Sequence, residues 1–186
     1  MTVWELRYAS INDYAMVVPL RQDDLLARRF DTDGSPMDWM DRPLVGFADS
    51  SRRKNKRPPA DVSVMVPGAL VLSERAREAL GPLLLKFGQL LELECEVNAD
   101  VRYFYNVTNL LQCVDVDRSE KNDFGDIRLE AFDESNVPED AAVFKDLATA
   151  DIRIYVNDAG KALIEKAVAS ASLTGIECGR VEPIPG

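Results

Sequence analysis

Histidine is absent from the 186 residues of this chain. Because histidine is the commonest general base and metal-binding side chain, its absence removes every Ser-His and Cys-His nucleophile arrangement. Catalysis would have to depend on carboxylates, lysine, tyrosine or a metal ion held by oxygen ligands. Glycine-rich phosphate loops and zinc-binding spacings are missing as well. These absences favour a protein that is not an enzyme and that has no cofactor.

Long apolar runs are also lacking. No stretch reaches the roughly 18 apolar residues that a transmembrane helix needs. The first residues, Met1 to Arg7, show no basic region followed by an apolar stretch, which a secretory signal would have. The sequence therefore predicts a cytoplasmic protein with no membrane partner.

The chain has only three cysteines, an odd number. The residues are Cys95, Cys113 and Cys178, which form no C-x-x-C motif and which each lie in an apolar, β-like segment. We expect buried free thiols, because a reducing cytoplasm opposes the alternative of one disulfide with a spare thiol.

Acidic residues are abundant. The net charge is −10, from 22 basic and 32 acidic residues, and residues 61–186 hold 12 basic and 23 acidic ones, a net charge of −11. Such a surface repels nucleic acid and favours a basic protein partner. The one basic run, residues 52–57, precedes a double proline and is interpreted as an exposed connector rather than as a nucleic-acid site.

Hydrophobic patterns predict strands and two main helices. Ser73 followed by Glu74, with Gly81-Pro82 beyond, predicts a helix over residues 74–80, and Asn157 or Asp158 begins a second helix that ends at residues 173–175. On the second helix, one face is predicted to carry Leu163, Ile164, Ala167 and Val168. The predicted strands cover residues 3–8, 16–20, 62–66, 91–97, 101–107, 110–116, 126–132 and 153–156, with a last strand from Ile176.

These elements predict an α+β fold with a mostly antiparallel sheet, two main helices and a loop-rich N-terminal region. Residues 101–132 are expected to form a meander, because turn residues separate their strands. Residues 1–60 are predicted to be an N-terminal strand and loop region that ends in the basic connector. Residues 61–186 are predicted to form the α+β domain.

The candidate partner-binding residues are Glu92, Glu94 and Glu96. They alternate with Leu91, Leu93 and Cys95, so on a strand the three carboxylates lie on one face, about 6.8 Å apart. Such a face is either solvated or a surface for docking a partner. A catalytic carboxylate pair is a weaker interpretation, because such pairs usually come from different elements that face a cleft.

A second acidic pattern runs from Asp115 to Asp126 and has some of the alternate oxygen ligands of a calcium loop. The position that requires glycine is Glu120, and the flanking segments are predicted strands instead of helices. A polar connection between strands is therefore expected here, and no metal site.

Several short pieces of residues 67–179 resemble immunity protein family eleven of bacterial polymorphic-toxin systems, formerly a domain of unknown function. The pieces are residues 71–80 (VLSERAREAL), 105–107 (YNV), 114–119 (VDVDRS), 137–138 (VP), 143–145 (VFK), 154–159 (IYVNDA) and 173–177 (LTGIE).

The resemblance implies a non-enzymatic immunity protein that binds and neutralises a cognate toxin domain by occlusion and so protects the producing cell. It identifies neither the toxin nor the surface that binds it; a basic nuclease would suit the acidic excess. Two alternatives stay open: a carboxylate- or metal-dependent hydrolase using Asp115, Asp117 and Asp123, and a scaffold protein with no toxin target. The oligomeric state is not predicted.

Overall fold

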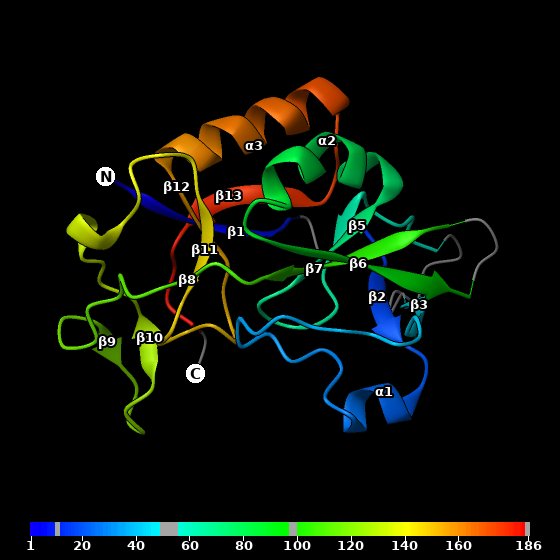
Figure 1. Cartoon of the computed structure of the whole chain (residues 1–186), viewed down its shortest axis with the longest axis horizontal. Helices are drawn as coiled ribbons and strands as arrows, with labels where there is room; N and C mark the ends of the chain where they lie inside the picture. The colour runs from blue at the N-terminus through cyan, green and yellow to red at the C-terminus, as the bar shows by residue number, and fades with distance from the viewer. Residues whose placement is uncertain (10–11, 49–55, 97–99, 185–186) are drawn as a thin grey trace.

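The computed structural model describes residues 1–9, 12–48, 56–96 and 100–184. Its strands form two large mixed sheets and one small hairpin, and helices α2 and α3 cover one face of the large sheets while α1 lies on the opposite side (Figure 1). The six-stranded sheet has the order β2-β3-β6-β7-β5-β4, from Met16–Pro19, Leu44–Ala48, Gly88–Cys95, Arg102–Val107, Leu70–Ser73 and Val62–Ser63. The five-stranded sheet has the order β13-β1-β12-β11-β8, from Ile176–Arg180, Val3–Tyr8, Tyr155–Asn157, Val143–Asp146 and Leu110–Leu111.

The hairpin joins β9 (Glu120–Lys121) to β10 (Ile127–Leu129). Within the described ranges, three α-helices, α1 (Gln22–Leu26), α2 (Glu74–Leu84) and α3 (Asp158–Ala171), and one 3-10 turn, η1 (Glu134–Asn136), complete the elements. The pairings β3–β6 and β11–β8 are parallel, and the other pairings within the large sheets are antiparallel. The predicted α+β class is confirmed.

Helix α2 begins where its capping residue predicts. The Ser73 hydroxyl accepts a hydrogen bond from the Ala76 amide at 3.2 Å, which satisfies a donor that the first turn leaves free. The predicted end at Leu80 is wrong, because the helix continues through Gly81 and Pro82 to Leu84. Leu84 is only 1% exposed, so its burial in the core accompanies the extra turn.

Helix α3 begins after Asn157, whose side-chain oxygen accepts from the Gly160 amide at 2.8 Å. The helix ends at Ala171, before the predicted end at residues 173–175, and the chain leaves it through Ser172 in the left-handed conformation at φ 49°. Gly175 follows at φ +81°. Ile164 is buried, but Leu163 is 48% exposed, so the predicted apolar face is wrong at that position.

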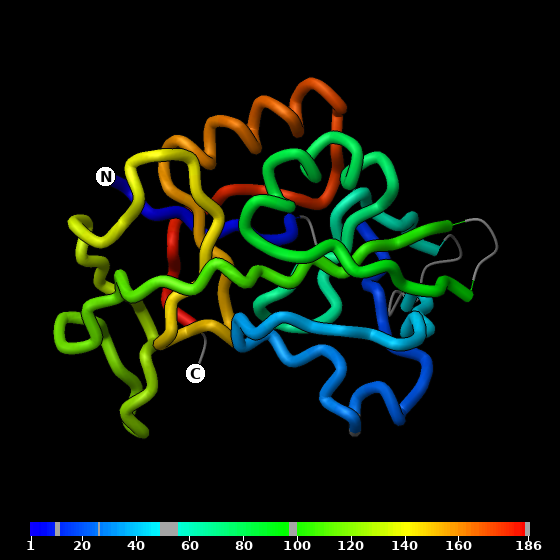
Figure 2. Tube along the Cα trace, viewed as in Figure 1, coloured from blue at the N-terminus to red at the C-terminus, as the bar shows by residue number. Residues whose placement is uncertain are grey.

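The buried apolar side chains of the described residues form three hydrophobic clusters. The largest contains side chains of α2, α3 and both sheets, for example Leu80, Ile164, Tyr105 and Val156. The other two clusters lie on the opposite faces, where irregular segments cover the sheets. Figure 2 follows these segments: residues 20–43 pass below the six-stranded sheet, and residues 112–139 lie at the end of the five-stranded sheet.

The predicted meander over residues 101–132 is wrong. Strand β7 belongs to the six-stranded sheet, β8 pairs with β11 in the other sheet, and β9–β10 form a separate hairpin. Strands β7 and β8 pair with β5 and β11, which are distant in the chain, and short turn signals cannot reveal such pairings. Strands from both sides of residue 60 share each large sheet, and the predicted division there stays a prediction.

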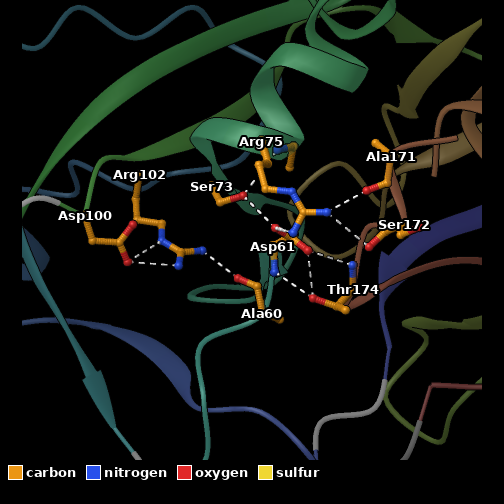
Figure 3. A network of polar contacts seen from close by, with 10 residues as sticks. Ala60, Asp61, Ser73, Arg75, Asp100, Arg102, Ala171, Ser172 and Thr174 are labelled. Atoms are coloured by element: carbon orange, nitrogen blue, oxygen red, sulfur yellow. Dashed lines mark hydrogen bonds and ion pairs between the residues drawn. The ribbon is translucent and has the colours of Figure 1, made fainter. Parts of the chain in front are cut away.

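A polar junction centred on Asp61 ties the start of α2 to the exit of α3 (Figure 3). The Asp61 carboxylate accepts from the amide and hydroxyl of Thr174 and from the Ser73 hydroxyl, at 2.9–3.1 Å. Arg75 approaches it within 3.5 Å and also donates to the Ala171 carbonyl. Because these polar groups pair with one another, the junction is a structural feature of the fold.

None of the helices in the described ranges combines the length and apolar character needed to cross a bilayer.

Candidate binding surface

The alternation predicted for a strand over residues 91–97 is confirmed over residues 91–95 of β6; Glu96 lies just beyond the end of the strand, and residue 97 lies outside the described residues. Leu91, Leu93 and Cys95 pack into the cluster around Phe104, so the glutamates between them project from the opposite face. Glu94 and Glu96 are exposed, while Glu92 is partly buried. We call Glu92, Glu94 and Glu96 the strand surface.

Arginines from the N-terminal region lie against the strand surface. Arg42 forms an ion pair with Glu92 at 2.8 Å, and Arg21 lies 4.0 Å from Glu94. The Glu96 carboxylate lies beside Gly46 of the neighbouring strand β3. The arginines thus offset part of the charge that a partner would meet.

The three cysteines are free thiols, as predicted. Cys113 is buried, but Cys95 and Cys178 are only partly buried, so the prediction of full burial is wrong for these two. Cys95 is the last residue of β6, where the sheet covers it less completely. Burial raises the pKa of the Cys113 thiol to about 12, with Asp146 adding to the effect.

A second acidic region covers residues 115–140, which hold ten acidic and three basic residues. Among the described residues, no Lys or Arg lies within ion-pair distance of Asp117, Glu120 or Asp123. All three are exposed. The negative charge is therefore less offset here than on the strand surface.

Asp115 shapes the first turn of this region. Its carboxylate accepts from the amides of Asp117 and Arg118 at 3.1 Å and pairs with the Arg118 guanidinium at 2.5 Å. The Arg118 contact lowers the Asp115 pKa below its usual range. The acidic segment from Asp115 to Asp126 is thus a turn followed by strand β9 and the hairpin tip, where a single polar connection between strands was predicted. In the described part of the chain, no group of three or more His, Cys, Asp or Glu is arranged to hold a metal ion.

Asn122 shapes the tip of the β9–β10 hairpin. Its side-chain oxygen accepts from the amides of Phe124 and Asp126 at 2.9–3.0 Å, and its backbone oxygen accepts from the Gly125 amide. Gly125 has φ +91°, a conformation that glycine adopts without strain. The Phe124 side chain is 91% exposed at this ordered tip.

Buried carboxylates hold the base of the region against the five-stranded sheet. After β10, Glu130 accepts from the Tyr155 hydroxyl at 2.8 Å and lies 3.1 Å from the Arg153 guanidinium. Before β9, Asp146 accepts from the amides of Cys113 and Val114 at 2.6 and 2.8 Å. The hairpin is therefore mounted on the core at both ends.

A groove of about 640 Å³ lies beside the hairpin. Hairpin residues, including Asp126 and Ile127, line one part of it, and Asp151 and Ile152 belong to the segment between β11 and β12 that lines another. Val116 and Ile152, both on its lining, are 44% and 39% exposed. Arg128 also lines the groove, which is thus a concave surface with apolar, acidic and basic side chains.

Glu130 and Lys145 are buried polar side chains that the sequence pattern does not reveal. Lys145 is fully buried and donates to the Thr32 carbonyl oxygen, and burial lowers its pKa to about 8. It lies within the sequence Val143-Phe144-Lys145, whose run of apolar residues was the only available signal of burial. Both residues connect distant segments and support the fold.

The chain matches no protein-family model and no curated protein.

Proposed function

We propose that this chain is an immunity protein that binds one bacterial toxin domain in the cytoplasm and blocks it by occlusion. The observation that carries the proposal is the concentration of acid: ten acidic and three basic residues in residues 115–140, mounted on a rigid core. A surface of one charge sign speeds association with a partner of opposite charge. A cationic toxin, such as a nuclease, is the partner that this surface suits.

Occlusion requires a surface complementary to the partner in shape and charge, and it needs no catalytic group. A chain without histidine is consistent with this mode of action. The ordered hairpin and its anchored base support tight binding, because a preformed surface loses less conformational entropy on association. Nuclease toxins and their immunity proteins are among the tightest protein pairs known. The resemblance to immunity protein family eleven supports the same function.

The strand surface contributes to this function through its charge. Glu92, Glu94 and Glu96 add to the negative field that attracts a cationic partner, and such long-range effects act on the association rate. Because Arg42 and Arg21 offset part of that charge, we propose that these carboxylates steer the partner and add little to the final affinity.

The test is rescue from toxicity. The toxin candidate is the protein encoded by the neighbouring reading frame, expressed under an inducible promoter with and without this chain. We expect this chain to restore growth and its purified form to inhibit the toxin at a one-to-one ratio. Continued toxicity at matched expression would contradict the proposal. A turnover activity of this chain that is lost in Asp115→Asn would instead support the hydrolase alternative.

A further inference from the structure

We propose that the hairpin tip is the docking site for the toxin, with Phe124 entering an apolar pocket on a cationic surface of that partner. The inference rests on the proposed function and adds to it the surface and the anchoring residue. We call Asp117, Glu120, Asp123, Phe124 and the adjoining groove the hairpin surface.

Phe124 is unlike the other phenylalanines of the chain. The chain has seven, and six of them pack into the three hydrophobic clusters: Phe30, Phe47, Phe87, Phe104, Phe132 and Phe144. Phe124 belongs to none of them and is 91% exposed. A large aromatic side chain contributes binding free energy when a partner buries it, and aromatic residues are enriched among the residues that dominate interfaces.

The tip is ordered before any partner arrives. The Phe124 amide donates to the Asn122 side chain at 3.0 Å, and the Asn122 amide donates to the Asp126 carbonyl at 2.9 Å. These contacts fix the backbone that presents the aromatic ring. Docking therefore requires little ordering of the loop, which lowers the entropic cost of association.

The surrounding charge selects the kind of occupant. The exposed carboxylates Asp117, Glu120 and Asp123 precede Phe124 in the sequence. Asp126 and Asp151 line the groove together with one basic residue, Arg128, so acidic residues outnumber basic ones there. An acidic rim around an apolar anchor complements a partner whose apolar pocket is bordered by Lys and Arg. A second copy of this chain, at net charge −10, would be repelled. The occupant we infer is thus a basic protein surface.

The test measures binding of an inactive toxin domain, taken from the neighbouring reading frame, to Phe124→Ser and to a matched control. The control is Met40→Ser, because Met40 is 99% exposed and lies in the N-terminal region. We expect Phe124→Ser to raise the Kd about 30-fold or more, mostly through faster dissociation, as for a residue that dominates an interface. Met40→Ser should change the Kd less than twofold. Thermal unfolding of each variant verifies the fold.

A photo-crosslinker adds a readout that does not depend on affinity. We expect p-benzoylphenylalanine at position 124 to cross-link to the toxin domain, and the same group at position 40 to give no product. Normal toxin binding by Phe124→Ser, without cross-linking at 124, would overturn the docking site and leave the proposed function intact. If wild type binds no toxin domain, both the proposed function and the docking site are overturned. Self-association that Phe124→Ser abolishes would assign the tip to a second copy instead.

Discussion

The strand surface and the hairpin surface are both acidic, but their surroundings differ. On β6, Arg42 and Arg21 lie against the glutamates, and the apolar side chains of the strand are directed into the core. On the hairpin, Asp117, Glu120 and Asp123 are exposed, and Phe124 is exposed beside them. An acidic strand face can be accounted for as the solvated side of a half-buried strand. An acidic tip that exposes a phenylalanine has no such structural explanation.

The largest expected effect concerns the anchor of the hairpin. Glu130→Ala should lower the free energy of unfolding by about 3–5 kcal/mol, because it leaves the buried Arg153 without one of its two carboxylate partners. Urea denaturation measures this value. Glu139→Ala, an exposed change in the same segment, is the control and should cost under about 0.5 kcal/mol. Equal stability of the two variants would show that the buried contact does not hold the hairpin.

A smaller effect is expected at the tip. Asn122→Ala removes the acceptor of the Phe124 and Asp126 amides, so we expect a local loss of about 1–2 kcal/mol and faster hydrogen exchange at those two amides. Amide exchange followed by NMR measures the effect, and β6 amides serve as the internal control. Unchanged exchange at Phe124 would mean that the tip does not depend on Asn122.

The strand surface should tolerate change. Arg42→Gln breaks the ion pair with Glu92, and both side chains of this pair are substantially exposed. We therefore expect the free energy of unfolding to fall by at most about 1 kcal/mol, and by less at high salt. Thermal unfolding at low and high salt measures it. A decrease of several kcal/mol in the free energy of unfolding would show that this pair supports the sheet. The strand surface would then be as important for stability as the base of the hairpin.

The smallest expected effect is a change in the pKa of Asp115. Arg118 holds the Asp115 pKa below its ordinary value of 3.8, so the carboxylate binds protons less readily in the folded state than in the unfolded state. Its contribution to stability is complete above that ordinary value and is lost as the pH falls through the folded pKa. NMR titration should show the low value in wild type and a higher one in Arg118→Gln. Identical titrations would contradict the ion pair.

Local signals predicted local structure well. Ser73 and Asn157 cap the helices where expected, because a cap depends on residues three positions apart. The alternation along β6 also placed the glutamates on one face. The pairing of β8 with β11 was not predictable, because it joins residues more than 30 positions apart and no turn signal reports it.

The hairpin surface was also not predicted as a binding site. The sequence marks Asp115 to Asp126 as acidic and Phe124 as one more aromatic residue, which would ordinarily be assigned to a core. Only the fold reveals that this ring lies outside every cluster. The burial of Glu130 was not predicted either. A glutamate near other acidic residues is expected to be exposed, but Glu130 is buried.

Two charge-matched variants test the central claim most directly. Glu120→Lys/Asp123→Lys and Glu94→Lys/Glu96→Lys each replace two exposed carboxylates by two lysines and change the net charge by +4, one pair on the hairpin surface and one on the strand surface. Binding kinetics with the inactive toxin domain should show slower association for both pairs at low salt, because both weaken the overall negative field. At physiological salt, we predict that only the hairpin pair weakens the Kd, by at least about tenfold, or 1.4 kcal/mol. Equal losses for the two pairs, or a larger loss for the strand pair, would contradict the hairpin as the docking site.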